Sequence, residues 1–198
     1  MGRSSTARER ILAAACELML SRGYGSIGVA EICARADVKK GSFYHFFESK
    51  QALTIEAIDV HWHTQRTEWV TALSGPEPAL SRVERLIRAQ VAAQRQPIVN
   101  GCLLGNLTLE LSSQDQAVLA RLEEIFEEQI QLIQRVLNEA VTEGTIPTDT
   151  ANHSTARSIV AQLEGMVMFA KLANNPDLLD DLWSQILLLL RAHAPSAA

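Results

Sequence analysis

Apolar residues recur every three to four positions along most of this chain, which is the spacing that lines one face of an α-helix. The pattern predicts nine helices, at approximately residues 6–22, 29–36, 39–47, 49–73, 79–96, 102–111, 112–143, 150–173 and 177–193. Helix-breaking residues separate several of them, most clearly at 74–78 and 174–176. Because no segment alternates between apolar and polar residues as a strand does, we expect an all-α fold.

Residues 26–53 contain two short helical patterns joined by a tight turn. The first pattern is apolar on one face, at Val29, Ile32, Cys33 and Ala36. The second pattern combines three phenylalanines for packing with side chains that can donate hydrogen bonds outward: Lys39, Lys40, Ser42, Tyr44 and His45. Two helices, a short turn and a donor-rich second helix predict a helix-turn-helix, which places the second helix in the major groove of DNA.

Short motifs in this region resemble the tetracycline-repressor (TetR) family of one-component transcriptional regulators. They are Gly23-Tyr24, Val29-Ala30-Glu31-Ile32, Ala36-x-Val38, Lys40-Gly41-Ser42-Phe43-Tyr44-His45-Phe46-Phe47 and Ser49-Lys50-x-x-Leu53. The resemblance covers approximately residues 6–53. It implies a DNA-binding domain over residues 1–48 and an effector-binding and dimerisation domain over residues 49–198. Two copies of the chain would then read a palindromic operator in double-stranded DNA.

The distribution of charge favours an oriented DNA-binding protein. The formal net charge is −5, which by itself argues against a nucleic-acid partner. Residues 1–50, however, hold eight Lys or Arg against five Asp or Glu, whereas the remaining 148 residues hold ten basic and eighteen acidic residues. A basic head on an acidic body would approach DNA head first.

The predicted DNA contacts follow from the chemistry of the second helix. Lys39 and Lys40 stand at its start, where side chains reach base edges, and lysine can donate to guanine O6 or N7. Hydroxyl and ring donors suit phosphate oxygens, and they are found at Ser42, Tyr44 and His45. Lys50 opens the next helix, where free N–H groups already favour anions, so we expect it to bind a phosphate. The family resemblance implies backbone contacts from Tyr44, His45 and Lys50 as well.

Three positions in this region depart from the family pattern. Asp37 stands in the turn where glycine is usual, and aspartate tolerates the left-handed conformation better than most residues. Gly28 replaces the usual Ser or Thr cap of the first helix, a change that costs roughly a few tenths of a kcal/mol. Lys39 replaces a common serine and adds a charge near the groove. We expect the first predicted helix, residues 6–22, to end at Gly23, because glycine adopts the left-handed conformation without strain.

The segment 101–111, GCLLGNLTLEL, places polar residues in an apolar run, a composition typical of small-molecule sites. We expect effector contacts from Trp62, Cys102, Asn106 and Thr108. The segment resembles a branch of the family that includes regulators of reductases and of acrylate or electrophile responses, and in that branch a nearby cysteine can be a sensing thiol. Cys102 would lie at a helix N-terminus, where the dipole favours the thiolate. The alternative is a buried, unreactive cysteine.

The last two predicted helices are apolar on more than one face, so the chain's own core does not use all of their apolar surface. We expect the excess to form a four-helix bundle in a two-fold homodimer, as the family resemblance also implies. The predicted contacts are Leu163, Val167, Leu182, Trp183, Ile186, Leu187 and Leu190. The alternative is that both helices are central in the core of a single chain.

Other classes of function find little support. No run of about 18 apolar residues would span a membrane, the polar start lacks a secretory signal, and three widely spaced cysteines suit a reducing compartment, so we expect a cytoplasmic protein. His61 and His63 point in different directions on a helix, and we expect neither a metal nor a cofactor.

No nucleophile–base arrangement or pair of carboxylates at helical spacing suggests an enzyme. We therefore expect a homodimeric repressor that a small-molecule effector releases from its operator. One alternative is an electrophile- or redox-sensing repressor that uses Cys102 on the same scaffold. A second is an activator or a nucleoid-type DNA-binding protein.

Overall fold

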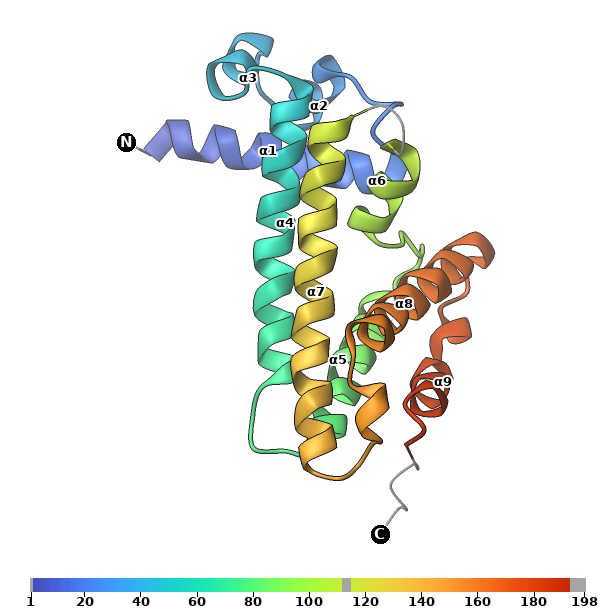
Figure 1. Cartoon of the computed structure of the whole chain (residues 1–198). Coiled ribbons are helices and arrows are strands. Elements are labelled where there is room, and N and C mark those ends of the chain that lie inside the picture. Colours follow the sequence, from blue (N-terminus) through green and yellow to red (C-terminus); the bar gives the residue numbers. More distant parts are fainter. Residues whose placement is uncertain (1, 112–114, 193–198) are drawn as a thin grey trace. The chain divides into compact units, whose positions relative to one another are not determined.

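A computed structural model describes residues 2–111 and 115–192 of the chain. Every regular element within these ranges is a helix, which confirms the predicted all-α fold (Figure 1). The α-helices are α1 (Gly2–Arg22), α2 (Val29–Arg35), α3 (Lys40–Phe46), α4 (Lys50–Leu73), α5 (Ala79–Ala93), α6 (Leu103–Leu111), α7 (Gln116–Thr142), α8 (His153–Ala173) and α9 (Leu182–Leu189). Two short 3₁₀-helices, η1 (Thr148–Thr150) and η2 (Pro176–Leu179), flank α8. None of these helices is long and apolar enough to cross a membrane.

Most of the predicted helix bounds agree with the structure, but the last predicted helix is wrong. It is divided into η2 and a separate α9 of only 8 residues. The Asn175 side chain caps η2 by accepting the N–H of Asp177 at 3.0 Å, and a tightly wound 3₁₀-helix rarely extends beyond a single turn. The interruption buries Leu179 and Leu182 together. The predicted end of this helix at His193 lies outside the described residues.

The predicted start of α7 lies partly outside the described residues, which omit 112–114. The described part confirms a capped helix. The Asp115 carboxylate accepts the N–H of Val118 at 3.1 Å, as the side chain at a helix N-terminus commonly does.

The chain divides into two compact units. Unit 1 comprises Met1–Gln65 and Cys102–Ile125, and unit 2 comprises Arg66–Gly101 and Phe126–Ala198. The helices α4 and α7 therefore contribute one part to each unit. The predicted domains, 1–48 and 49–198, group α6 with the effector region, whereas packing groups α6 with the helix-turn-helix. The functional division after residue 48 stays a prediction.

In unit 1, α1, α2 and α3 contact one another and α6 packs against α1 (Figure 1). The local conformations expected from the sequence are present. Gly23 ends α1 with a φ of 85°, and Asp37 adopts a φ of 51° in the turn between α2 and α3. Gly28 is the N-cap of α2, in an extended conformation. These backbone angles orient α3 relative to α2 and complete the helix-turn-helix.

In unit 2, α8 contacts both η2 and α9, and α5 contacts α9. The ends of α8 are well defined. Asn152 caps its start by accepting the N–H of Thr155 at 3.0 Å. Asn174 ends it in the left-handed conformation and accepts the N–H of Val99 at 2.9 Å. The amide side chain of Asn174 therefore also fixes the segment that follows α5.

Candidate nucleic-acid interface and effector region

The helix α3 packs through its phenylalanines and presents its hydrogen-bond donors to solvent. Phe43 is fully buried and Phe47 is 3% exposed. The opposite side carries the predicted DNA contacts: Lys39, Lys40, Tyr44 and His45 are exposed, and Ser42 is half-buried. Tyr44 is 53% exposed although its neighbour Phe43 is fully buried. The structure therefore brings five of the six predicted DNA-binding residues together on one accessible helix and its N-cap.

Ion pairs partly neutralise the arginines near this surface. Arg35 bonds the Glu17 carboxylate at 2.5 Å, and Arg22 pairs with Glu31. The Lys40 ammonium, by contrast, lies 5.9 Å from the centre of the Tyr44 ring on the same helix face. The N-terminus of α3 thus presents exposed ammonium groups beside a phenol, a combination suited to base edges and phosphates.

Lys50, the sixth predicted residue, has a role that sequence reasoning missed. Its ammonium donates a hydrogen bond to the carbonyl of Ile27 at 2.6 Å and another to the carbonyl of Tyr24. It also lies 3.8 Å from the centre of the Tyr24 ring. Partial burial lowers the pKa of Lys50, and the Glu110 carboxylate opposes that shift. Phosphate binding by Lys50 stays a prediction, because two of its three N–H donors serve the chain's own backbone.

The four residues predicted to contact an effector all lie in unit 1. Trp62 is 3% exposed on α4. Asn106 and Thr108 are half-buried on α6, and the Thr108 hydroxyl donates to the Leu104 carbonyl within the same helix at 2.9 Å. Their role as an effector site stays a prediction.

Cys102 lies immediately before the first turn of α6, as expected. Its half-buried sulfur accepts the N–H of Gly105 at 3.5 Å, and its carbonyl accepts the N–H of Asn106 at 2.9 Å. Burial raises the pKa of Cys16 to about 11 and also raises that of Cys33, which disfavours the thiolate form of both.

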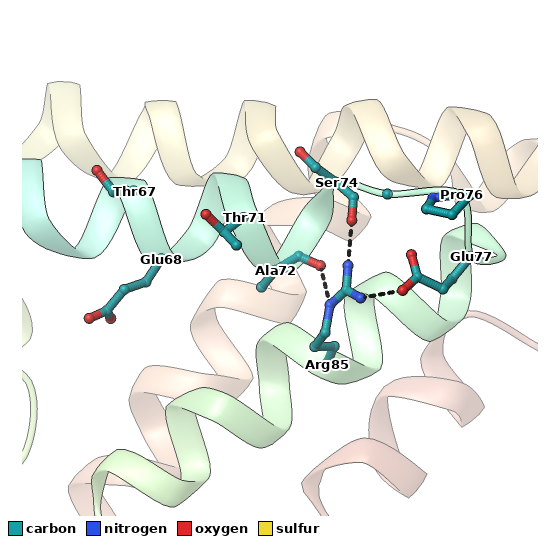
Figure 2. Close-up of a pocket in the computed structure, with 9 residues that line it drawn as sticks. Thr67, Glu68, Thr71, Ala72, Ser74, Pro76, Glu77 and Arg85 are labelled. Atoms are coloured by element: carbon teal, nitrogen blue, oxygen red, sulfur yellow. Dashed lines mark hydrogen bonds and ion pairs between the residues drawn. The ribbon is translucent and has the colours of Figure 1, made fainter.

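A pocket of about 530 Å³ lies elsewhere, at the end of α4 and the start of α5 (Figure 2). Its lining residues are Thr67, Glu68, Thr71, Ala72, Ser74, Gly75, Pro76, Glu77 and Arg85. The Arg85 guanidinium donates to the Ala72 carbonyl at 2.9 Å and to Glu77 at 2.8 Å, and it also bonds the Ser74 carbonyl. None of the predicted effector residues lines this pocket. Its size suits a small molecule, but its arginine already holds the loop that leads into α5.

The residues predicted to form a dimer interface are buried within the chain itself. Their exposed fractions are 4% for Leu163, 4% for Val167, 0% for Leu182, 9% for Trp183, 0% for Ile186, 7% for Leu187 and 0% for Leu190. The chain itself therefore covers these side chains, and their part in a dimer interface stays a prediction. Because α9 is short and packs against both α5 and α8, it uses two of its faces inside the chain. The large apolar side chains that α8 and α9 expose are instead Met168, Phe169, Leu172 and Leu188.

The candidate histidine pair has no metal-binding arrangement. His61 is half-buried, and burial lowers its pKa, whereas His63 is exposed. Among the described residues, no group of three or more His, Cys, Asp or Glu side chains is placed to hold a metal ion.

Comparison with known proteins gives consistent results over most of the chain. Residues 11–57 match the family model described as bacterial regulatory proteins of the tetR family, and residues 79–186 match a tetracyclin repressor-like C-terminal domain. The chain is 30% identical to the HTH-type transcriptional repressor DhaR of Mycobacterium sp. (strain GP1), over 87% of this chain and 86% of DhaR.

It is also 31% identical to the transcriptional regulator AcuR of Cereibacter sphaeroides, over 88% of this chain and 80% of AcuR. The crystal structure of the reduced form of E. coli NemR has the same fold, with a TM-score of 0.86, 23% identity and coverage of 96% of this chain and 99% of that one.

Proposed function

Because the chain belongs to the TetR family of transcriptional regulators and is not an enzyme, we propose that it represses transcription from a palindromic operator as a homodimer. A small-molecule effector then releases it from the DNA. The observation that carries this proposal is the row of exposed donors on α3, with Phe43 of that helix buried in the core. Such a helix can enter the major groove without disturbing its own packing.

Homodimer formation is supported by exposed apolar side chains on α8 and α9. Phe169 is 52% exposed and Leu172 is 82% exposed on α8, and Leu188 is 78% exposed on α9. Large apolar side chains gathered on neighbouring helices favour a protein interface. A two-fold axis would place the same helices of two chains against each other and would pair two α3 helices for two half-sites.

Effector release is supported by the polar groups of α6, and repression is supported by the relative DhaR, which is named as a repressor. Cys102 and Asn106 are half-buried, so a ligand could reach them without unfolding the helix. A ligand can lower operator affinity only if it binds better to a conformation that does not fit the operator.

Selection of duplexes from a random pool by the full-length chain tests the proposal. The expected product is a palindrome with half-sites about one helical turn apart, bound by one dimer. Selection of unrelated sequences, or of single half-sites by a monomer, would contradict it.

A thiol-sensing repressor is the second candidate, and the position of Cys102 before α6 favours it. Iodoacetamide at neutral pH serves as the probe. Alkylation is expected at Cys102 before Cys16, because a thiol with a pKa of about 11 is thiolate for only about one part in 10⁴ at pH 7. If alkylation releases the selected duplex from wild type and not from Cys102→Ser, thiol sensing is supported. Release from both proteins would remove Cys102 from the mechanism.

A further inference from the structure

The loop between α1 and α2, residues 23–28, receives a carboxylate from a distant part of the chain. One oxygen of Glu110, in the last turn of α6, accepts the N–H of Tyr24 at 2.6 Å. The other oxygen accepts the N–H of Gly25 at 2.5 Å. Two successive backbone N–H groups that converge on one anion form a nest, and bonds of this kind to a charged acceptor are stronger than neutral ones.

The glycines of this loop leave the space that the carboxylate occupies. A Cβ at Gly23 would lie 2.8 Å from one Glu110 oxygen, and a Cβ at Gly25 would lie 3.0 Å from the other. Gly23 also adopts a φ of 85°, which side chains rarely allow. The loop is therefore shaped for the carboxylate as well as for the turn.

A lysine of α4 holds the same loop through two of its backbone carbonyls. Lys50 binds the carbonyls of Tyr24 and Ile27, and its ammonium lies over the Tyr24 ring. Burial and the neighbouring Asp115 carboxylate raise the pKa of Tyr24, and that carboxylate accepts a hydrogen bond from Gln51 at 2.7 Å. Tyr24 is thus bonded by Lys50 of α4 and by Glu110 at the end of α6, both of which belong to unit 1.

This contact connects the two regions that the proposed function requires to communicate. The helix α6 has Cys102 immediately before its first turn and Glu110 in its last turn, so a displacement of this short helix moves both ends together. The loop leads directly into α2, and α2 contacts α3. A shift of Glu110 would therefore change the support of the DNA-reading helix.

We propose that Glu110 is a positioning residue that couples α6 to the helix-turn-helix: its carboxylate holds the loop in the conformation that binds DNA, and displacement of α6 by an effector releases it. This inference rests on the proposed function. Thermodynamic linkage requires that operator binding in turn strengthen the Glu110 contact.

The test uses the full-length chain with Glu110→Ala, and with Glu110→Gln as a variant of the same size. The matched control is Asp59→Asn, which removes a carboxylate that bonds Arg121 at 2.6 Å in the same unit. The probe is the duplex selected by wild type. Affinity for this duplex is expected to fall about tenfold in Glu110→Ala, less in Glu110→Gln, and not in the control.

Amide hydrogen exchange supplies a readout that a purely structural role would not change. In wild type, the duplex is expected to slow exchange at Tyr24 and Gly25 by at least about fivefold, and this protection is expected to be lost in Glu110→Ala. The inference is overturned if Glu110→Ala binds the duplex like wild type, or if the duplex leaves exchange at these two amides unchanged. A wild-type chain that selects no duplex would instead overturn the proposed function.

Discussion

Individual side chains of the helix-turn-helix region divide into exposed donors, which we propose contact DNA, and groups that support the fold. Lys40 and Tyr44 are exposed on α3, whereas Phe43 on the same helix is fully buried. Lys50 belongs in part to the supporting group, because its ammonium bonds two backbone carbonyls. Mutation of Lys50 would therefore disturb the loop that carries Tyr24 and Ile27, in addition to removing any proposed phosphate contact.

Substitutions on α3 can separate phosphate contacts from base contacts. Tyr44→Phe removes one hydroxyl from an exposed ring and is expected to weaken binding to all duplexes by about 0.5–1.5 kcal/mol, without changing the dependence on salt. Lys40→Ala is expected to reduce the preference for the selected duplex over a scrambled one by about 1–3 kcal/mol. Fluorescence anisotropy with both duplexes measures these effects. Equal losses on both duplexes for Lys40→Ala would assign that lysine to the phosphates.

At the scale of helices, one buried arginine organises unit 2. Arg82 on α5 is 7% exposed, and its guanidinium bonds the Leu73 carbonyl at the end of α4 at 3.0 Å and Glu139 on α7 at 2.5 Å. A third bond, at 3.0 Å, reaches the Glu77 carbonyl before α5. The planar guanidinium can satisfy three acceptors at once, which lysine cannot do in this geometry.

Removal of this arginine is expected to destabilise the fold far more than removal of a neighbouring one. Arg82→Met leaves the Leu73 carbonyl without its donor and is expected to lower the free energy of unfolding by about 2–4 kcal/mol. The matched control is Arg88→Met on the same helix, which breaks only an exposed pair with Glu84 and is expected to cost about 0.3–0.5 kcal/mol. Urea titration measures both variants. Similar midpoints for the two would show that Arg82 is dispensable.

At the scale of the whole molecule, assembly depends on side chains that a single chain leaves uncovered. Most apolar residues of α9 are buried within the chain, whereas Leu188 of that helix is exposed. Met168, Phe169 and Leu172 lie along α8 at spacings of one to four residues, and all three are substantially exposed.

A charge on this surface is expected to prevent dimer formation while leaving the fold intact. Leu172→Glu enters a two-fold interface twice, and it is expected to raise the dimer dissociation constant by at least about 100-fold and to abolish tight binding to the palindrome. Leu109→Glu is the control, because Leu109 is 69% exposed on α6 in unit 1. Sedimentation velocity distinguishes the two. A dimeric Leu172→Glu would place the interface elsewhere.

Local physics explains which features the sequence by itself determined. Helical periodicity, the left-handed turns at Gly23 and Asp37, and the phenylalanine-rich face of α3 depend on residues a few positions apart, and all are present in the structure. The exposed donors of α3 are likewise set by residues that are neighbours in the sequence. These features suffice for the family and for the DNA-reading helix.

Tertiary structure decided what depends on residues far apart in the sequence. Leu187 is buried because the break after η2 turns α9 onto α5 and α8, and periodicity cannot show how much of an apolar helix its neighbours cover. The contact of Glu110 with Tyr24 spans 86 residues. Only two features of the sequence hint at this contact. Glu110 is the single acid in the apolar run 101–111, and two glycines flank Tyr24. Only folding brings the carboxylate to the two backbone N–H groups, because neither local segment specifies its partner.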